Sequence, residues 1–135
     1  MKKFILLSSL FASCWAFAQS IIGEWKVQKV LWNTPENSYA LTPILEKAYR
    51  YGNFIEFKED KTFVSYYSAP CGNDCFPSSK GTFEFIGKDK IELTIKEIAK
   101  NGMCSEPIFQ EKGNWNLGIY TIKKTEKGID LIQNK

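Results

Sequence analysis

Residues 81–98 read "GTFEFIGKDKIELTIKEI", and this stretch determines the fold class of the chain. Phe83 and Phe85 alternate with polar residues before Gly87-Lys88-Asp89, and Ile91, Leu93 and Ile95 alternate with polar residues after it. A period of two is typical of β-strands that bury one face, and glycine and aspartate favour a tight turn between them. The stretch therefore predicts two antiparallel strands joined by a hairpin turn.

The same alternation recurs along most of the chain, with turn residues between the runs. It predicts eight strands, at residues 22–32, 53–58, 62–69, 81–87, 90–98, 104–111, 115–123 and 128–133. One short helix is expected in the first long loop, at "TPILEKAYR" (42–50), with Thr42 as its N-cap and Gly52 just past its end. The fold class is therefore all-β.

The connections between these strands differ in length in a regular way. Those at 59–61, 88–89 and 112–114 are very short, whereas those at 33–52, 70–80, 99–103 and 124–127 are mostly longer. In an antiparallel up-and-down meander these two sets fall at opposite ends. We therefore expect the meander to close into a small barrel with one tight end and one end surrounded by loops.

The N-terminal 18 residues have the pattern of a signal peptide. Lys2 and Lys3 precede an apolar run, and Ala16-Phe17-Ala18 supplies a small–x–small cleavage site. We expect export to the periplasm or the medium; a lipoprotein anchored through Cys14 is the less favoured alternative. Residues 19–135 then form a single domain. The net charge of +3 includes both leader lysines, and no basic stripe indicates a nucleic-acid partner.

The stretch "IIGEWKV" at 21–27 contains Gly23-x-Trp25 at the start of the first predicted strand. It resembles the opening of the lipocalin-like (calycin-type) barrels. The resemblance implies that the tryptophan plugs the tight end and that the cup holds a small apolar ligand. We assign Gly23, Trp25 and Trp115 to the barrel base, and Lys135 or Gln133 to the place of the basic residue that covers the tryptophan. Residues 53–107 are also similar to META-type secreted bacterial β domains, a likeness that implies a small envelope protein and no catalytic residues.

Three cysteines follow the leader: Cys71, Cys75 and Cys104. The 70–80 and 99–103 loops fall at the same end of the predicted meander, and disulfides are the default for cysteines of exported proteins. The chain-entropy model gives about 3.8 kcal/mol for closing the 34 residues 71–104 and about 2 kcal/mol for closing residues 71–75. We therefore expect Cys104 to pair with either Cys71 or Cys75.

Catalysis is not expected from this sequence. The chain contains no histidine, so the usual serine and cysteine nucleophiles lack their base. Zinc requires four ligands, usually including histidine or a second cysteine pair, and the Cys-x-x-x-Cys spacing differs from the redox motif. We predict no enzyme activity, no cofactor and no metal.

The aromatic residues suggest two functions. Trp25, Phe57, Phe63, Phe83, Phe85 and Trp115 are predicted to point inward, whereas Trp32, Tyr66, Tyr67 and Phe76 are candidates for a ligand mouth between the 33–52 and 70–80 loops. The first hypothesis is a module that binds a small apolar molecule. The alternative is an envelope protein-binding factor or inhibitor that acts through the disulfide-braced 70–80 loop. If Phe63, Phe83, Phe85 and Leu93 meet across the barrel, the cup is full and a carrier is excluded.

Overall fold

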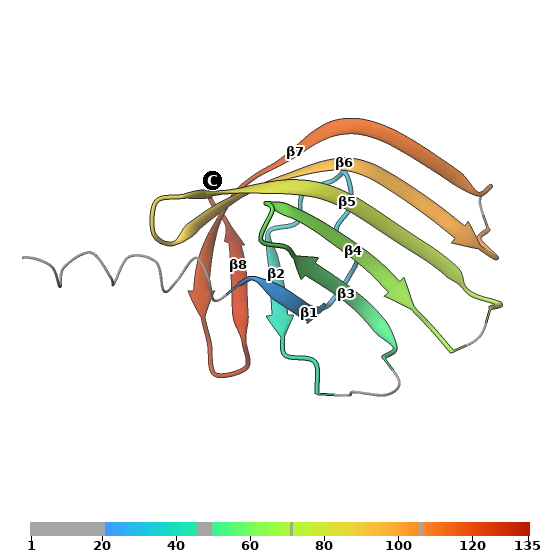
Figure 1. Cartoon of the computed structure of the whole chain (residues 1–135), viewed down its shortest axis with the longest axis horizontal. Coiled ribbons are helices and arrows are strands. Elements are labelled where there is room, and N and C mark those ends of the chain that lie inside the picture. Colours follow the sequence, from blue (N-terminus) through green and yellow to red (C-terminus); the bar gives the residue numbers. More distant parts are fainter. Residues whose placement is uncertain (1–20, 46–49, 71, 106) are drawn as a thin grey trace, which may run out of the picture.

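The computed structural model describes residues 21–45, 50–70, 72–105 and 107–135, which form an eight-stranded antiparallel barrel (Figure 1). The strands are β1 (Gly23–Val27), β2 (Ser38–Thr42), β3 (Gly52–Phe57), β4 (Thr62–Ser68), β5 (Cys75–Ile86), β6 (Lys90–Gly102), β7 (Phe109–Lys124) and β8 (Ile129–Gln133). The described residues contain no helix, and hence none that is long and apolar enough to span a membrane.

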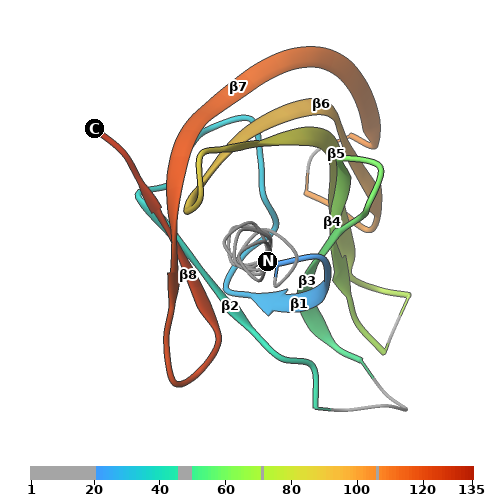
Figure 2. The same ribbon diagram turned by 60° about the vertical axis from the view of Figure 1, so that its left-hand side comes forward.

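The strands follow one another around the barrel with a single exception. Each strand from β3 to β7 pairs with the next in the chain, and β1 pairs with β3. β2 lies between β1 and β8 and closes the ring, which Figure 2 shows nearly end-on. The predicted all-β fold and its closed up-and-down barrel are therefore confirmed.

The first long loop differs from the prediction because it contains a strand. Tyr39 and Leu41 of β2 are buried on one face and alternate with exposed Ala40. Thr42 pairs with Lys26 at the end of this strand, so it is not a helix N-cap. Residues 43–45 are irregular, and the rest of the predicted helix includes residues 46–49, which lie outside the described part.

The strand predicted at 104–111 and the one predicted at 115–123 are replaced by the single long strand β7. Gly113 was expected to form a turn, but it continues the strand, and the indole of Trp115 lies directly over it. A Cβ at residue 113 would come within 2.5 Å of the Trp115 ring. The glycine is needed here for a close contact, and no change of chain direction occurs.

β5 and β6 also extend further than expected. Cys75 already pairs with Gly102, and the pairing continues through Pro77 and Lys100. The predicted 70–80 loop therefore shrinks to residues 69–74, and the 99–103 loop moves to residues 103–108. The predicted loop at 124–127 is a short turn on the other side of the molecule from these two.

The half of the barrel nearest the turns at 58–61 and 87–89, which we call the closed end, is filled by phenylalanine rings. Phe57 contacts Phe63 and Phe83 at centroid distances of 5.9 and 5.2 Å, and Phe83 contacts Phe85 at 5.5 Å. Phe57, Phe63, Phe83 and Leu93 belong to one core cluster, against which the partly buried Phe85, Trp25 and Trp115 pack. The protein's own side chains therefore fill this half, so a ligand that occupies the whole cup is excluded.

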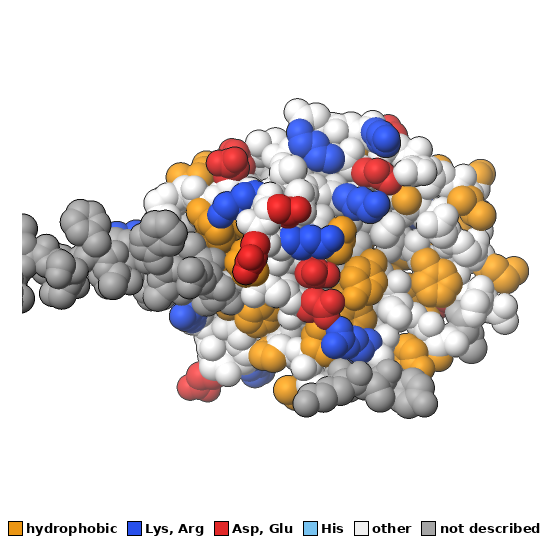
Figure 3. All heavy atoms as spheres, viewed as in Figure 1, with side chains coloured by type: hydrophobic (Ala, Val, Ile, Leu, Met, Phe, Trp, Pro, Cys, Tyr) orange, Lys and Arg blue, Asp and Glu red, His pale blue; other side chains and the backbone are white. Residues whose placement is uncertain are grey.

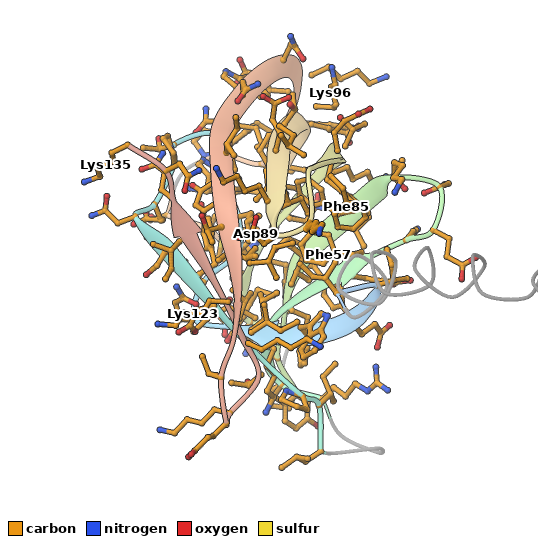
Figure 4. The ribbon with its side chains drawn as sticks, turned by 90° about the vertical axis from the view of Figure 1, so that its left-hand side faces the viewer. Phe57, Phe85, Asp89, Lys96, Lys123 and Lys135 are labelled. Carbon is orange, nitrogen blue, oxygen red and sulfur yellow. A yellow bond between two sulfur atoms is a disulfide. The ribbon has the colours of Figure 1, made fainter. Side chains whose placement is uncertain are left out.

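The closed end is sealed by Ile21 and Trp25. Ile21 is fully buried, and its carbonyl oxygen accepts a 2.9 Å hydrogen bond from the Trp25 indole nitrogen. The cation at this end is Lys61, whose Nζ lies 4.3 Å from the centroid of the Phe85 ring. Lys135 lies at the periphery in Figure 4, far from Phe57 and Phe85, and the Gln133 side chain donates instead to the Leu117 carbonyl. Neither therefore takes the position that the sequence suggested.

Candidate functional site

The opposite end of the barrel, which we call the open end, is where the 69–74 and 103–108 loops meet. A disulfide joins Cys75 to Cys104, and the Met103 amide donates to the Asp74 carbonyl at 3.0 Å. The predicted bridge to Cys104 is confirmed, and Cys75 is its partner; Cys71 lies outside the described residues. These two links hold the loops together at the rim.

The segment between β1 and β2, residues 28–37, covers this end and reaches up beneath β6 and β7 (Figures 1 and 2). Leu31 is fully buried and belongs to the core cluster although it lies in a loop. Its amide donates a 3.1 Å hydrogen bond to the hydroxyl of Ser65 on β4. Leu31 therefore acts as an internal plug below the rim.

The far end of the 28–37 segment is fixed by two buried tyrosines. Tyr120 donates a 2.8 Å hydrogen bond to the Glu36 carbonyl, and the Glu36 amide donates to the Tyr39 hydroxyl. Burial raises the pKa of Tyr39 and of Tyr120 above the usual value for tyrosine. At the near end, the Gln28 side chain bonds the backbone of Ser38 and Ala40. The segment is thus anchored at both ends, with Val30, Leu31 and Trp32 at its centre.

Two aromatic clusters lie at the open end. In the first, Trp32 meets Phe109 edge to face at 6.3 Å, with the Lys100 ammonium 5.6 Å from the Trp32 ring centroid. In the second, Tyr67 lies 5.9 Å from Phe76 and donates to the Asp74 carboxylate at 2.7 Å. This hydrogen bond raises the pKa of Tyr67. All four rings are half-buried, so each presents an apolar edge to solvent.

Of the four residues that the sequence suggested for a ligand mouth, three lie in these clusters: Trp32, Tyr67 and Phe76. Tyr66 points to the outer face of β4, where its ring stacks on Phe54 at 5.5 Å. Of the residues assigned to the base, Gly23 and Trp25 lie at the closed end, whereas Trp115 lies in the middle of β7 opposite Ile95.

Below the two clusters, the barrel wall carries two inward-facing serines. Ser65 and Ser79 are direct cross-strand partners on β4 and β5, and they are the buried polar residues of the described chain. Ser65 also donates to the Phe54 carbonyl at 3.0 Å. Ser79 is only 2% exposed, yet its buried hydroxyl makes no hydrogen bond. An unpaired buried hydroxyl is unfavourable, so a native site that retains one has a reason to do so.

Sequence reasoning missed Ser79, Leu31 and Phe109. Ser79 continues the inward set of Gly81 and Phe83, but the strand was predicted to begin at residue 81. Leu31 was assigned to a strand, and nothing in its sequence context shows that it turns into the barrel. Phe109 fell within the strand predicted at 104–111.

Other parts of the described surface are weaker candidates for a ligand site than the open end. A depression of about 350 Å³ lies outside the barrel, between β2 and the β7–β8 turn, and it is lined by Leu41 and by charged residues such as Glu126 and Asp130. Within the described residues, no three cysteine or acidic side chains are grouped so as to hold a metal ion. Figure 3 shows hydrophobic side chains gathered toward the right-hand end, which is the open end, and mixed charges over the middle strands.

The model of the lipocalin-like domain matches residues 21–126, which is most of the chain and includes both ends of the barrel. The chain belongs to the lipocalin-like domain family. No curated protein and no solved structure matches it. Membership of the lipocalin-like family agrees with the closed eight-stranded barrel, and it suggests that the domain binds a small ligand.

Proposed function

We propose that this lipocalin-like protein is an exported, non-catalytic module that binds a small apolar molecule at the open end of its barrel. The ligand lies between the two aromatic clusters and enters the space that Leu31 occupies in the structure. Residues 19–135 are the mature domain, and residues 1–18 are its cleaved leader. Since the closed end is filled by phenylalanines, the ligand occupies only the upper half of the barrel.

The observation that carries this proposal is the contrast between the two ends. At the closed end Phe57, Phe63 and Phe83 are buried and pack on one another, with Phe85 and Trp25 half-buried at its edge. At the open end, Trp32, Tyr67, Phe76 and Phe109 are all half-exposed. Small-molecule sites are concave and mainly apolar, with a few polar groups, and they often lie at barrel mouths. The disulfide is compatible with export, and the absence of histidine from the sequence supports a non-catalytic role.

Titration with N-phenyl-1-naphthylamine, an uncharged probe that fluoresces in apolar sites, tests the proposal. We expect saturable binding to the full chain purified from an exporting host. Trp32→Ala should weaken binding about tenfold, because it removes one wall of the mouth. Tyr66→Ala is the matched control: it removes an aromatic ring one residue from Tyr67 but on the outer face. Absence of probe binding, or an equal loss in both variants, would refute a site at the open end.

A second function is favoured by the exposed rim. Met103 and Ile108, at the two ends of the 103–108 loop that the disulfide ties to the 69–74 loop, are 67% and 64% exposed. Such side chains suit an envelope protein partner or an enzyme to be inhibited, since a braced loop loses little entropy on binding. Crosslinking in the envelope with a photoreactive residue at position 103 tests this alternative; a discrete protein adduct that is absent with the same group at exposed position 132 would support it.

A further inference from the structure

We propose that the ligand is an uncharged alcohol, whose hydroxyl replaces the Leu31 amide at Ser65 and also bonds Ser79. This inference rests on the proposed function, because it names the chemical class of the molecule in the same site. It depends on three features of the upper half of the barrel: its lack of buried charge, the hydrogen-bonding state of each serine, and the position of Leu31.

The first feature is charge. The described chain buries no acidic or basic side chain; its buried polar residues are Ser65 and Ser79. A carboxylate or ammonium group drawn into the barrel would have no partner of opposite charge, and an unpaired buried charge is strongly unfavourable. A neutral polar group can be satisfied by two hydroxyls. The interior therefore selects uncharged ligands.

The second feature is the hydrogen bonding of the serines. Ser65 uses its proton to bond the Phe54 carbonyl, so its oxygen can only accept another hydrogen bond, and it accepts one from the Leu31 amide. Ser79 uses neither its proton nor its lone pairs. A ligand atom beside both must donate to Ser65 and can accept from Ser79. A hydroxyl does both, whereas a ketone can only accept.

The third feature is geometry. Ser65 and Ser79 are directly opposite on neighbouring strands, a relation that places two Cβ atoms roughly 5 Å apart. One polar atom between them can reach both hydroxyls. The Leu31 amide already holds the Ser65 side of this position, and the Leu31 side chain fills the adjacent apolar space. In this way Leu31 acts as a stand-in for the ligand, supplying a donor next to an aliphatic group.

Displacement of N-phenyl-1-naphthylamine by ten-carbon compounds tests the proposal. We expect 1-decanol to displace the probe at concentrations at least tenfold lower than decanoate does, and about threefold lower than 2-decanone. Ser79→Ala should raise the 1-decanol concentration needed about fivefold. Ser78→Ala, the matched control on the outer face of the same strand, should leave it unchanged. Leu31→Ala should lower it about fivefold, whereas Val30→Ala, a loop neighbour outside the core cluster, should not.

The outcomes separate the two proposals. If the probe fails to bind the wild-type protein, the proposed function fails, and this inference fails with it. If the probe binds but decanoate or 2-decanone displaces it as well as 1-decanol does, the alcohol assignment is overturned while the binding function stands. Equal effects of Ser79→Ala and Ser78→Ala overturn the role of Ser79.

Discussion

The two inward serines should respond in opposite ways when their hydroxyls are removed. Ser65 bonds the Leu31 amide at 3.1 Å and the Phe54 carbonyl at 3.0 Å, and it is fully buried. Ser65→Ala deletes two hydrogen bonds of about 1 kcal/mol each and leaves a buried amide unpaired, for a total loss of about 2–4 kcal/mol. Ser79→Ala deletes no hydrogen bond and removes a desolvated hydroxyl, so stability should stay equal or rise by up to about 1 kcal/mol.

Differential scanning calorimetry of the oxidised protein measures this difference. In a domain of this size, about 1 kcal/mol corresponds to roughly 4 °C in Tm, so Ser65→Ala should melt about 8–16 °C below wild type. Ser79→Ala should melt at or slightly above the wild-type temperature, and Ser78→Ala controls for the general effect of losing a serine from β5. A comparable fall in Tm for Ser65→Ala and Ser79→Ala would refute the hydrogen-bond assignment on which the ligand site depends.

Three further perturbations test the rest of the barrel. Trp25→Ala should cost about 3–5 kcal/mol in urea unfolding because it unplugs the closed end; a loss within about 1 kcal/mol would sink that role. Cys104→Ser opens the loop from Cys75, a separation of 29 residues, and should cost about 3.6 kcal/mol in the chain-entropy model. We expect this variant to unfold at the same urea midpoint as the reduced wild-type protein. A difference between these two midpoints would point to another bridge. Burial raises the pKa of Tyr120, so its stabilising effect is fully present below the unfolded value near 10 and is lost as pH rises from there through the raised folded value. Tyr120→Phe, which cannot bond Glu36, should cost about 1 kcal/mol at pH 7 and flatten the loss of stability above pH 10; an unaltered alkaline slope would argue against it.

The alternation of apolar residues was sufficient to predict the barrel, because most inward positions hold a phenylalanine or a branched aliphatic residue; Ser65 and Ser79 are exceptions. The alternation was a poor guide where a residue is present because it permits a close contact. Gly113 was interpreted as a turn because a sequence does not show that the Trp115 ring lies over it. β2 was missed because its five residues include only two buried ones, Tyr39 and Leu41. The count of eight strands was right, although one predicted pair is a single strand and another strand was unforeseen.

The candidate site could be predicted from the sequence only in part, for a related reason. Trp32, Tyr67 and Phe76 could be identified because they lie near loops, and Cys104 because a disulfide is the default expectation for cysteines that follow a signal-peptide pattern. Ser79 has no distinguishing local sequence; its importance appears only when the structure shows a buried hydroxyl without a hydrogen bond. Leu31 likewise becomes a plug only through the path of the 28–37 segment. Both features depend on contacts between distant strands, which periodicity does not encode.

A native mass spectrum of the unreduced protein, purified from an exporting host, tests the central claim most directly. The account predicts a polypeptide that begins at Gln19, with an additional mass of a few hundred daltons that is released on denaturation and proves to be an uncharged molecule. A spectrum of the bare chain alone, unchanged after incubation with the neutral lipids of the same host, would contradict a small-ligand binding function.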